Sequence, residues 1–416
     1  MVKFNDQLLK IRNTKYGSHI VADLYSDNNL NNIDYIKNLL EDSARLVNAT
    51  ILHTHMHKFE PHGVTGVVLL AESHISIHTW PEDNFISIDI FMCGDCDPEK
   101  ALYYIVEQLN ATIINIKLLT RGNIDYFNEN ILLDTYQQRF KVKEWLVDDK
   151  SEFQKIDILD TEFHGKALIL DGTVQTTELD EFCYHEMIAH VPIFACSHLP
   201  KNVLVIGGAD GGVVREVIKH KSIQQVSLVD IDGKVKDLCM QYLPQISNGA
   251  LNDDRVTVKI EDGIKYIKQY SRSDLDIIIV DSTDPVDCAV PLFTKDFYQS
   301  CYNSLVTNGL LCVQSGLPIY YTDNSIYDNN QLSNITAHLR SIFKYVTHYV
   351  AVIPTYVGGY MVFTLASDDN NIDKLSISEL EEKFNVSGIQ DLKSYNVKLH
   401  YSAFMLPNYI IKATGK

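Results

Sequence analysis

The sequence lacks the features that would place the protein in a membrane or outside the cell. Its 416 residues contain no apolar run of about eighteen residues that would span a bilayer, and the opening MVKFNDQLLK lacks the pattern of a signal peptide. The eight cysteines are scattered, so we interpret them as free thiols and not as a disulfide framework. We expect a cytoplasmic protein with no membrane partner.

Positive charge is also scarce. The chain has 36 Lys and Arg against 54 Asp and Glu, a formal net charge of −18. Nucleic acids and anionic membranes bind clustered Lys and Arg, so neither is an expected partner. An acidic field would speed the encounter with cationic small substrates, although solubility alone also accounts for this charge.

Strong metal-binding patterns are missing as well. Cys93 and Cys96 have a CxxC spacing, but no second pair accompanies them. His53, His55 and His57 alternate and would share one strand face, where three histidines are able to hold a metal. With no carboxylate of known proximity, a polar sheet surface is the better interpretation, and we predict no metal cofactor.

The length suits two or three domains, and the first 123 residues predict a small α/β sandwich. Two amphipathic helices are expected, one carrying Ile33 and Ile36 at helical spacing and one beginning at Asp97-Pro98, an N-cap followed by proline. Segments rich in β-branched residues predict strands at 19–24, 50–56, 66–70, 86–91 and 113–118. A polar segment at 124–137 is predicted to be a linker.

The remainder predicts two further domains. Residues 138–198 contain short alternating segments split by turns, which indicate a small antiparallel β domain. From residue 199 to 416 the pattern is strand, glycine turn and helix, repeated, which is typical of a Rossmann-like doubly wound sheet. Short apolar runs predict its buried parallel strands at 203–206, 226–229, 256–260, 277–280 and 310–313.

The string LAESHISIHTWPE at 70–82 concentrates reactive side chains. Strand alternation places Ser73 and Ile75 on one face and His74 and His78 on the other, unless the chain turns sharply at Ser73. A serine and histidine pair permits nucleophilic catalysis. A polar strand with hydrogen-bonded histidines would produce the same pattern.

This string closely resembles the processing motif of the bacterial and archaeal S-adenosylmethionine decarboxylases, over about residues 17–123. The resemblance implies self-cleavage between Glu72 and Ser73, leaving Ser73 as a covalent pyruvoyl group. That group forms a Schiff base with the substrate amine, the role that pyridoxal phosphate plays elsewhere, so no pyridoxal phosphate is expected. His78 would take a proton during processing, with Thr65 in support.

The same resemblance assigns the decarboxylation step. Cys93, twenty residues after the serine, would reprotonate the carbanion left by decarboxylation. Phe59 and Trp80 would lie around S-adenosylmethionine, with Phe59 stacked on adenine. Glu60 and His62 stand where the family usually has serine and glutamine. They leave decarboxylation of ornithine or arginine open as an alternative.

A second motif lies at 203–212, where an apolar strand enters the glycine turn GGADGG. Glycines let the backbone approach a nucleotide, and Asp230 ends the next strand, where it would bind ribose. By itself this pattern leaves methyltransferases and dehydrogenases open. Asp210 within the turn would repel a pyrophosphate, which favours a cationic sulfonium nucleoside.

The flanking segments 170–187, 281–285 and 354–356 strongly resemble the spermidine synthases, from about residue 138 to the C-terminus. The resemblance implies that decarboxylated S-adenosylmethionine is the aminopropyl donor and putrescine the acceptor. The donor would be held by Gln154, Asp210 on its aminopropyl ammonium, Asp230 on its ribose and Asp262 on its adenine amine. Asp281, near Tyr184, would accept the proton of the attacking amine, and Asp284, Gln314 and Tyr356 would line the diamine pocket.

Departures from that family lie on the acceptor side. The sequence Asp-Cys-Ala-Val at 287–290 replaces Gly-Pro-Ala-Glu, and Gly316 stands where glutamate is usual, so the acceptor amine is left open. Together the halves predict a bifunctional, homo-oligomeric enzyme, dimeric or larger, in which one half makes the donor for the other. A regulatory role for one degenerate half is the remaining alternative, but both halves keep their expected catalytic residues.

Overall fold

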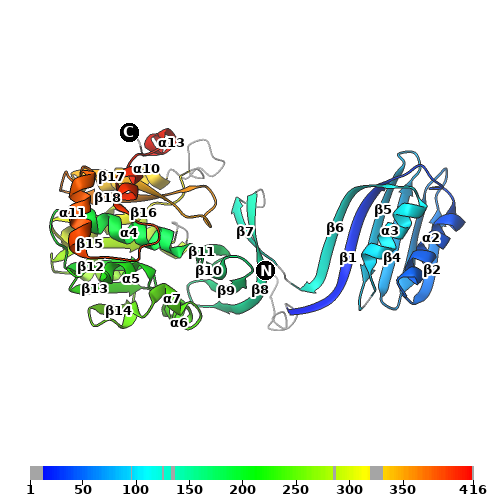
Figure 1. The fold of residues 1–416 in the computed structure, drawn as a ribbon, viewed down its shortest axis with the longest axis horizontal. Helices are drawn as coiled ribbons and strands as arrows, with labels where there is room; N and C mark the ends of the chain where they lie inside the picture. The colour runs from blue at the N-terminus through cyan, green and yellow to red at the C-terminus, as the bar shows by residue number, and fades with distance from the viewer. Residues whose placement is uncertain are drawn as a thin grey trace. The chain divides into compact units, whose positions relative to one another are not determined.

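The structure is a computed structural model that describes residues 13–94, 96–123, 126–132, 136–283, 287–318 and 331–414. The chain divides into two compact units, one ending at Tyr126 and the other beginning at Phe127. Figure 1 shows the elements of both units. Each unit is described by itself.

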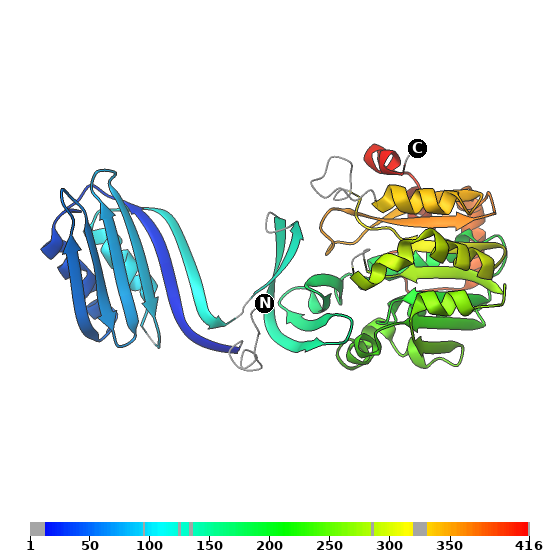
Figure 2. The same cartoon turned by 180° about the vertical axis from the view of Figure 1, so that it is seen from behind.

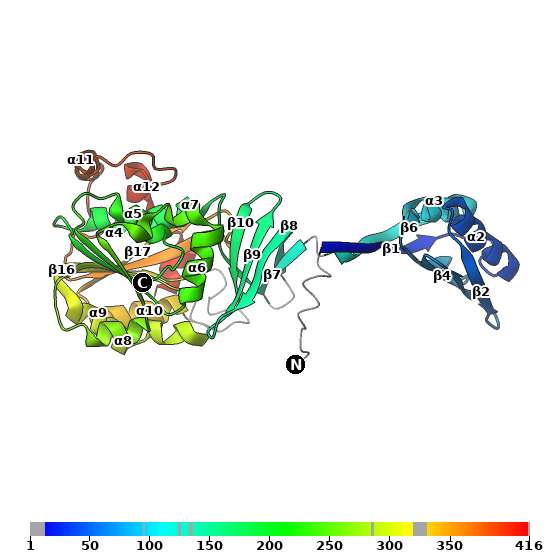
Figure 3. The ribbon, with the colours of Figure 1, turned by 90° about the horizontal axis from the view of Figure 1, so that it is seen from below.

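The first unit is a six-stranded antiparallel sheet in the order β2-β3-β4-β5-β1-β6, with two helices packed on one face (Figure 3). The predicted strands and helices of this unit are confirmed. Their bounds are β1 Asn13–Tyr25, α2 Ile33–Leu46, β2 Ile51–Lys58, β3 Val64–Leu70, β4 Ser73–Trp80, β5 Phe85–Met92, α3 Pro98–Gln108 and β6 Thr112–Asn123.

Alternation of apolar and polar residues creates this two-layer arrangement. Ile75 and Ile77 of β4 are fully buried beneath the helices, together with Ile36 and Leu40 of α2. Asp97 caps α3 as the sequence predicted, because its side chain accepts hydrogen bonds from two backbone amides of the first turn.

The opposite face of this sheet carries polar and aromatic side chains and, among the described residues, has no helix packed on it (Figure 2). Strand register arranges these side chains in rows. One row runs from Leu69 through His74 and Phe91 to His19, on four adjacent strands. Register therefore brings together side chains that are far apart in the sequence.

The second unit begins with a five-stranded sheet in the order β11-β10-β9-β8-β7. Its strands are β7 Tyr126–Leu132, β8 Tyr136–Lys150, β9 Lys155–Thr161, β10 Gly165–Leu170 and β11 Thr173–Thr177. The linker expected at 124–137 is corrected here, because that segment contains β7 and the start of β8. Polar and apolar residues are mixed in this segment, and β7 is an edge strand that nevertheless buries Phe127 and Glu129.

A seven-stranded sheet follows, in the order β14-β13-β12-β15-β16-β18-β17. The five predicted parallel strands are confirmed, and β18 and β17 extend the sheet in the antiparallel sense. The strands are β12 Asn202–Gly207, β13 Gln225–Asp230, β14 Val256–Ile260, β15 Leu275–Asp281, β16 Leu305–Gln314, β17 Tyr345–Val352 and β18 Tyr360–Ser367.

Helices cover both faces of this sheet, as expected for a doubly wound domain (Figure 3). Their bounds are α4 Glu181–Ala195, α5 Gly212–Ile218, α6 Gly233–Tyr242, α7 Pro244–Ser247, η1 Ala250–Asn252, α8 Gly263–Gln269, η2 Asp287–Phe293, α9 Lys295–Ser304, α10 Gln331–Arg340, α11 Ile377–Ser387, α12 Val397–Ala403 and α13 Asn408–Ala413.

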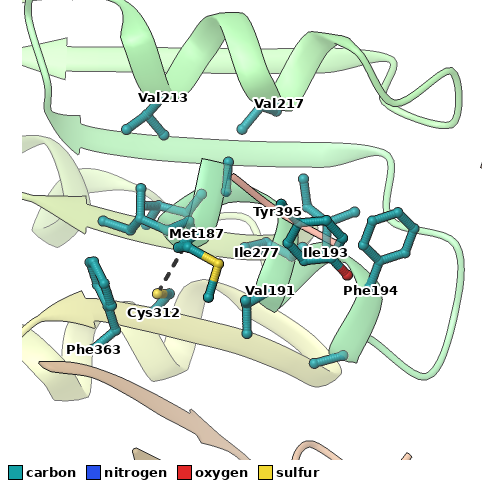
Figure 4. Close-up of a cluster of buried hydrophobic side chains, with 14 of the residues drawn as sticks. Met187, Val191, Ile193, Phe194, Val213, Val217, Ile277, Cys312, Phe363 and Tyr395 are labelled. Carbon is teal, nitrogen blue, oxygen red and sulfur yellow. Dashed lines mark hydrogen bonds between the residues drawn. The ribbon is translucent and has the colours of Figure 1, made fainter. Parts of the chain in front are cut away.

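Helix α4 is buried on almost every side. Figure 4 shows Met187 and Val191 of α4 packed between Val213 of α5 and the sheet residues Ile277 and Cys312. Most residues of such a helix are apolar because it has almost no solvent face, although α4 also buries the polar side chains Glu181 and His185. The side chains of its first turn, some of which reach the cavity described next, are therefore held in fixed positions.

Candidate active sites

A cavity of about 540 Å³ lies in the second unit, where the carboxyl ends of the parallel strands meet the five-stranded sheet. Ligands bind at this edge in open α/β sheets. The predicted residues that line it are Gln154, Tyr184, Asp210, Asp230, Asp262, Asp281, Gln314 and Tyr356. Asp284, also predicted here, lies outside the described residues. The structure therefore gathers these distant residues around one cavity.

Glycine is required where β12 enters its turn. Gly207 and Gly208 have φ of 84° and 71°, and a Cβ at either position would overlap Asp281. Only glycine adopts this conformation without strain and lets the turn approach so closely. The glycine turn thus sets the position of Asp281 as well as that of a ligand.

Asp210 lies in this turn beside His185. Its carboxylate accepts a 2.7 Å hydrogen bond from the Gly212 amide and lies 3.6 Å from Nε2 of His185, whose Nδ1 is 2.6 Å from Glu181. Burial opposes ionisation of Asp210, but the charge and hydrogen bond of His185 outweigh it and lower the pKa of Asp210. Burial also opposes protonation of His185, yet Asp210 and Glu181 raise its pKa to about 10.

Asp281 ends β15 and faces Tyr184 of α4. The Tyr184 hydroxyl donates a 2.6 Å hydrogen bond to its carboxylate. Burial, and then the charge of Asp210, raise the pKa of Asp281 to about 6, against the opposing effects of His185 and Tyr184. At neutral pH the group is mostly an ionised carboxylate, and it is a stronger base than an ordinary aspartate.

The donor side is linked to the five-stranded sheet through Asp232. Its carboxylate accepts hydrogen bonds of 2.9 Å from Gln154 and 2.6 Å from Ser151. Since the Gln154 amide nitrogen is engaged there, its carbonyl oxygen is left for a ligand. Asp230 accepts a hydrogen bond from the Asp232 amide, and burial raises the pKa of Asp230 to about 6.

Asp262 caps α8, because its side chain accepts hydrogen bonds from the amides of Ile264 and Lys265. It also lines the cavity. The helix cap and the expected contact with adenine are therefore compatible roles for one carboxylate with four acceptor positions.

Sequence reasoning missed Glu129 of β7. Its buried carboxylate lines the cavity and accepts hydrogen bonds from Gln138 and from the Val174 amide. Burial raises the pKa of Glu129. Tyr356 donates a hydrogen bond to the Gln175 carbonyl in the same part of the cavity. No motif marked Glu129, because the segment that carries it resembled a linker.

The first unit places Ser73 at the start of β4 with a φ of 146°. This conformation favours glycine, so the backbone at the expected cleavage site is strained. The Glu72 carbonyl accepts a 2.9 Å hydrogen bond from the Cys93 amide. The Glu72 carboxylate is anchored by the amide and hydroxyl of Thr50, which hold its pKa below the ordinary value.

The other predicted residues of this unit lie at the far end of β4. His78 is five residues beyond Ser73 on an extended strand, which is about 16 Å. Its Nδ1 is 2.7 Å from the Thr65 hydroxyl, and its ring lies beside Trp80. Phe59 is half-exposed and contacts His57. Within one chain, therefore, Ser73 and Cys93 form one group, and Thr65, His78 and Trp80 form another.

A chain of charged and aromatic residues beside Ser73 was not predicted. Nδ1 of His74 lies 3.3 Å from the Ser73 hydroxyl, and its Nε2 is 3.2 Å from Asp89. Asp89 also contacts Nε2 of His19 at 2.7 Å, and Arg121 contacts Nδ1 of His19 at 3.0 Å. Only the register of β4, β5, β1 and β6 reveals this cluster, because its members are up to 102 residues apart.

Within 13–94, 96–123, 126–132, 136–283, 287–318 and 331–414, no group of three or more His, Cys, Asp or Glu is placed to hold a metal ion. In the same part of the chain, no helix has both the length and the apolar character needed to cross a membrane.

Comparison with known proteins agrees with this geometry. The polyamine aminopropyltransferase 1 of Pseudomonas aeruginosa is 38% identical over 288 residues, which is 69% of this chain and 97% of that protein. The chain belongs to the polyamine aminopropyltransferase family. The polyamine aminopropyltransferase of Bacillus mycoides is 44% identical over 270 residues, 65% of this chain and 92% of that protein.

Family models match successive segments of the chain to two different enzyme families. Residues 18–122 match S-adenosylmethionine decarboxylase, 126–178 the spermidine synthase tetramerisation domain, and 181–376 the spermine/spermidine synthase domain. A spermidine synthase solved with the transition state analogue AdoDATO matches with a TM-score of 0.64 at 33% identity, over 70% of this chain and 94% of that chain. The spermidine synthase from Thermotoga maritima matches over the same shares with a TM-score of 0.62 and 33% identity. The recognised fusion and its fold class are confirmed.

Proposed function

We propose that the chain is a bifunctional enzyme of polyamine biosynthesis. The first unit would decarboxylate S-adenosylmethionine through a pyruvoyl group made from Ser73. The second would transfer the aminopropyl group of the product to putrescine and form spermidine. The proposal joins the two family assignments with the chemistry available at each site.

Aminopropyl transfer is supported most directly by the Tyr184–Asp281 pair. Displacement at the carbon beside the sulfonium requires an unprotonated amine held in line with that carbon. Asp281 is a buried carboxylate whose pKa of about 6 keeps it ionised at neutral pH, so it is able to accept the proton of the attacking amine. The lowered pKa of Asp210 suits a partner for the donor ammonium.

The donor and acceptor ends of the cavity carry carboxylates suited to cations. Asp230 and Asp262 would hold ribose and adenine at the donor end, with the carbonyl of Gln154 beside them. Glu129, Gln314 and Tyr356 line the rest of the cavity, and Asp284 remains a proposed contact of the diamine. We propose putrescine as the acceptor because a short diamine has one amine that attacks the donor, after losing its proton to Asp281, and a second, protonated amine for the acidic residues of the acceptor end.

The residues around Ser73 fit the formation of a pyruvoyl group. The strained φ of Ser73 and the Cys93 amide on the Glu72 carbonyl are features that activate a peptide bond for attack. Such a group supplies an electrophilic carbonyl that condenses with a substrate amine and accepts electrons as carbon dioxide leaves. The Cys93 side chain, one residue past β5, would deliver the proton that replaces the lost carboxyl.

The separation of Ser73 from His78 bears on assembly. Because His78 is about 16 Å along the strand, it would serve the Ser73 of a second copy and not that of its own chain. Thr65 and the rings of Trp80 and Phe59 would come with it. This geometry supports the proposed homo-oligomer, as does the match to a tetramerisation domain.

The decisive experiment is to supply the purified protein with S-adenosylmethionine, ornithine or arginine labelled in the carboxyl carbon and to measure released carbon dioxide. We expect carbon dioxide to be released from S-adenosylmethionine and not from the other two compounds. Spermidine should form when putrescine is added. Release from ornithine or arginine instead would overturn the substrate of the first unit. The variant Ser73→Ala should release no carbon dioxide from any of them.

A further inference from the structure

We propose that His74 is the base that activates Ser73 for self-cleavage, and that Asp89, His19 and Arg121 hold His74 in the required tautomer. This inference rests on the proposed self-cleavage. It assigns a catalytic role to a residue that neighbours Ser73 in the sequence but, in a regular strand, would lie on the opposite face.

The positive φ of Ser73 removes that obstacle. Ile75 and Ile77 continue the regular alternation and are fully buried, whereas Ser73 is only half-buried. Its hydroxyl lies 3.3 Å from Nδ1 of His74, on the side of the sheet away from the core. Strain at Ser73 therefore places the hydroxyl within hydrogen-bond reach of a base.

The tautomers follow from the donors at the end of the cluster. A guanidinium only donates, so Arg121 at 3.0 Å requires Nδ1 of His19 to be an acceptor. The ring proton of His19 is then on Nε2, where it donates to Asp89 at 2.7 Å. Arg121 also lies over the Phe91 ring, which fixes its position.

The same reasoning continues to His74. The Asp89 carboxylate accepts from Nε2 of His74 at 3.2 Å, which places the ring proton of His74 on Nε2. Nδ1 is left with its lone pair directed at the Ser73 hydroxyl. The order serine, histidine, carboxylate is that of an activated nucleophile, with His74 touching the reacting atom and Asp89 orienting it.

The chemical step balances within the chain. Nδ1 of His74 takes the Ser73 hydroxyl proton as Oγ bonds to the Glu72 carbonyl carbon. The carbonyl oxygen gains charge against the Cys93 amide, 2.9 Å away. The bond from that carbon to the Ser73 nitrogen then breaks, and the nitrogen takes the proton back from His74. The products are an ester between Glu72 and Ser73 and a free amine, which is the stage before chain cleavage.

Hydroxylamine cuts esters, so it reports this step separately from the later elimination. Wild-type protein is treated with hydroxylamine and followed by intact mass, beside His74→Ala, His74→Gln, Asp89→Asn, His78→Ala and His55→Ala. His55 is a matched control, since it is an exposed histidine of β2 on the same face. We expect the His74 variants to form ester at least about a hundredfold more slowly, as removal of a general base does. Asp89→Asn should be slow as well, and His55→Ala should match wild type.

Added imidazole distinguishes a lost base from a misfolded variant. It should restore ester formation to His74→Ala and leave Asp89→Asn, which still has its imidazole, unchanged. His78→Ala should form the ester but stop there, because His78 would take its proton in the elimination that follows. Wild-type rates in His74→Ala, or an ester that accumulates in that variant, would overturn the role of His74 while leaving self-cleavage intact. Wild-type protein that forms neither ester nor cleaved chains would overturn the proposed function and this inference with it.

Discussion

The hydroxyl of Tyr184 and the carboxylate of Asp281 are joined by a 2.6 Å hydrogen bond inside the cavity of the second unit. Tyr184 comes from a helix buried on almost every side, and Asp281 ends a central strand of the parallel sheet. Neither position is adjustable without disturbing the core. The base proposed for aminopropyl transfer is therefore held in one orientation before any substrate arrives, which lowers the reorganisation needed during reaction.

Tyr184→Phe should lower aminopropyl turnover about ten- to a hundredfold, the usual effect of losing a hydrogen bond to a charged group. Burial and Asp281 hold the pKa of Tyr184 well above its ordinary value, so the hydroxyl remains a donor. Its hydrogen bond lowers the pKa of Asp281, so removing it should shift the acidic limb of kcat/KM above about pH 6. Initial rates measured from pH 5 to 9 test both effects.

Tyr270→Phe is the matched control. Tyr270 also donates a hydrogen bond to an aspartate, Asp274 at 2.7 Å, but it does not line the cavity. An equal loss of turnover in both variants would mean that stability and not the reaction depends on Tyr184.

His185→Gln should change how stability depends on pH. The charges of Asp210 and Glu181 raise the pKa of His185 to about 10, against an ordinary value of about 6.5. A raised histidine pKa contributes stability that is complete below about pH 6.5 and is lost as pH rises toward 10. Wild-type protein should therefore lose more of its unfolding free energy between pH 6 and 9.5 than the variant does.

Tryptophan fluorescence during urea unfolding measures this difference. The chain has two tryptophans, Trp80 in the first unit and Trp145 in the second. In a Trp80→Phe background, Trp145 reports the second unit alone, which matters because two-unit proteins rarely unfold in one step. Parallel pH dependences in both proteins would contradict a charged His185.

Much of the fold was predictable because burial leaves a direct record in the sequence. The strand containing Leu204 and Val205 is covered on both faces and consists of consecutive apolar residues. The β4 residues Ile75 and Ile77 alternate with polar ones because one face alone is covered. The antiparallel strands β17 and β18 were not predicted, although both are rich in buried apolar residues.

Some residues of the candidate sites were predictable from the sequence and others were not. Asp210, Asp230 and Asp281 follow predicted strands, so the meeting of strand ends predicts that they lie together. Glu129 and the His19–Asp89–His74 cluster depend on which strands pair and in what register, and that is determined by packing over the whole sheet. The face of the sheet on which the Ser73 side chain lies was predictable only on the condition that the chain does not turn sharply there. A positive φ for serine leaves no mark in the sequence.

Asp281→Asn should remove most aminopropyl transfer, about a hundredfold or more, because an amide cannot accept the proton of the attacking amine. Donor binding, measured by calorimetry, should be nearly unchanged, and so should carbon dioxide release by the first unit. The defect should weaken as pH rises, since the diamine has a pKa near that of lysine, about 10, and more free amine is then present. Turnover near wild type at neutral pH would mean that the base lies elsewhere.

Cys93 has two chemical groups with separable roles, and its variants should separate them. The backbone amide donates to the Glu72 carbonyl at 2.9 Å, while the thiol is expected to act only after cleavage. Cys93→Ala keeps the amide, so it should cleave at the wild-type rate but decarboxylate poorly and become inactivated by transamination during turnover. Cys93→Pro removes the N–H and should slow cleavage about a hundredfold, as loss of an oxyanion donor does elsewhere.

Intact mass measures cleavage of both variants, and release of labelled carbon dioxide measures decarboxylation. Slow cleavage in Cys93→Ala would show that the thiol acts during processing, whereas normal decarboxylation by that variant would show that the proton comes from another group.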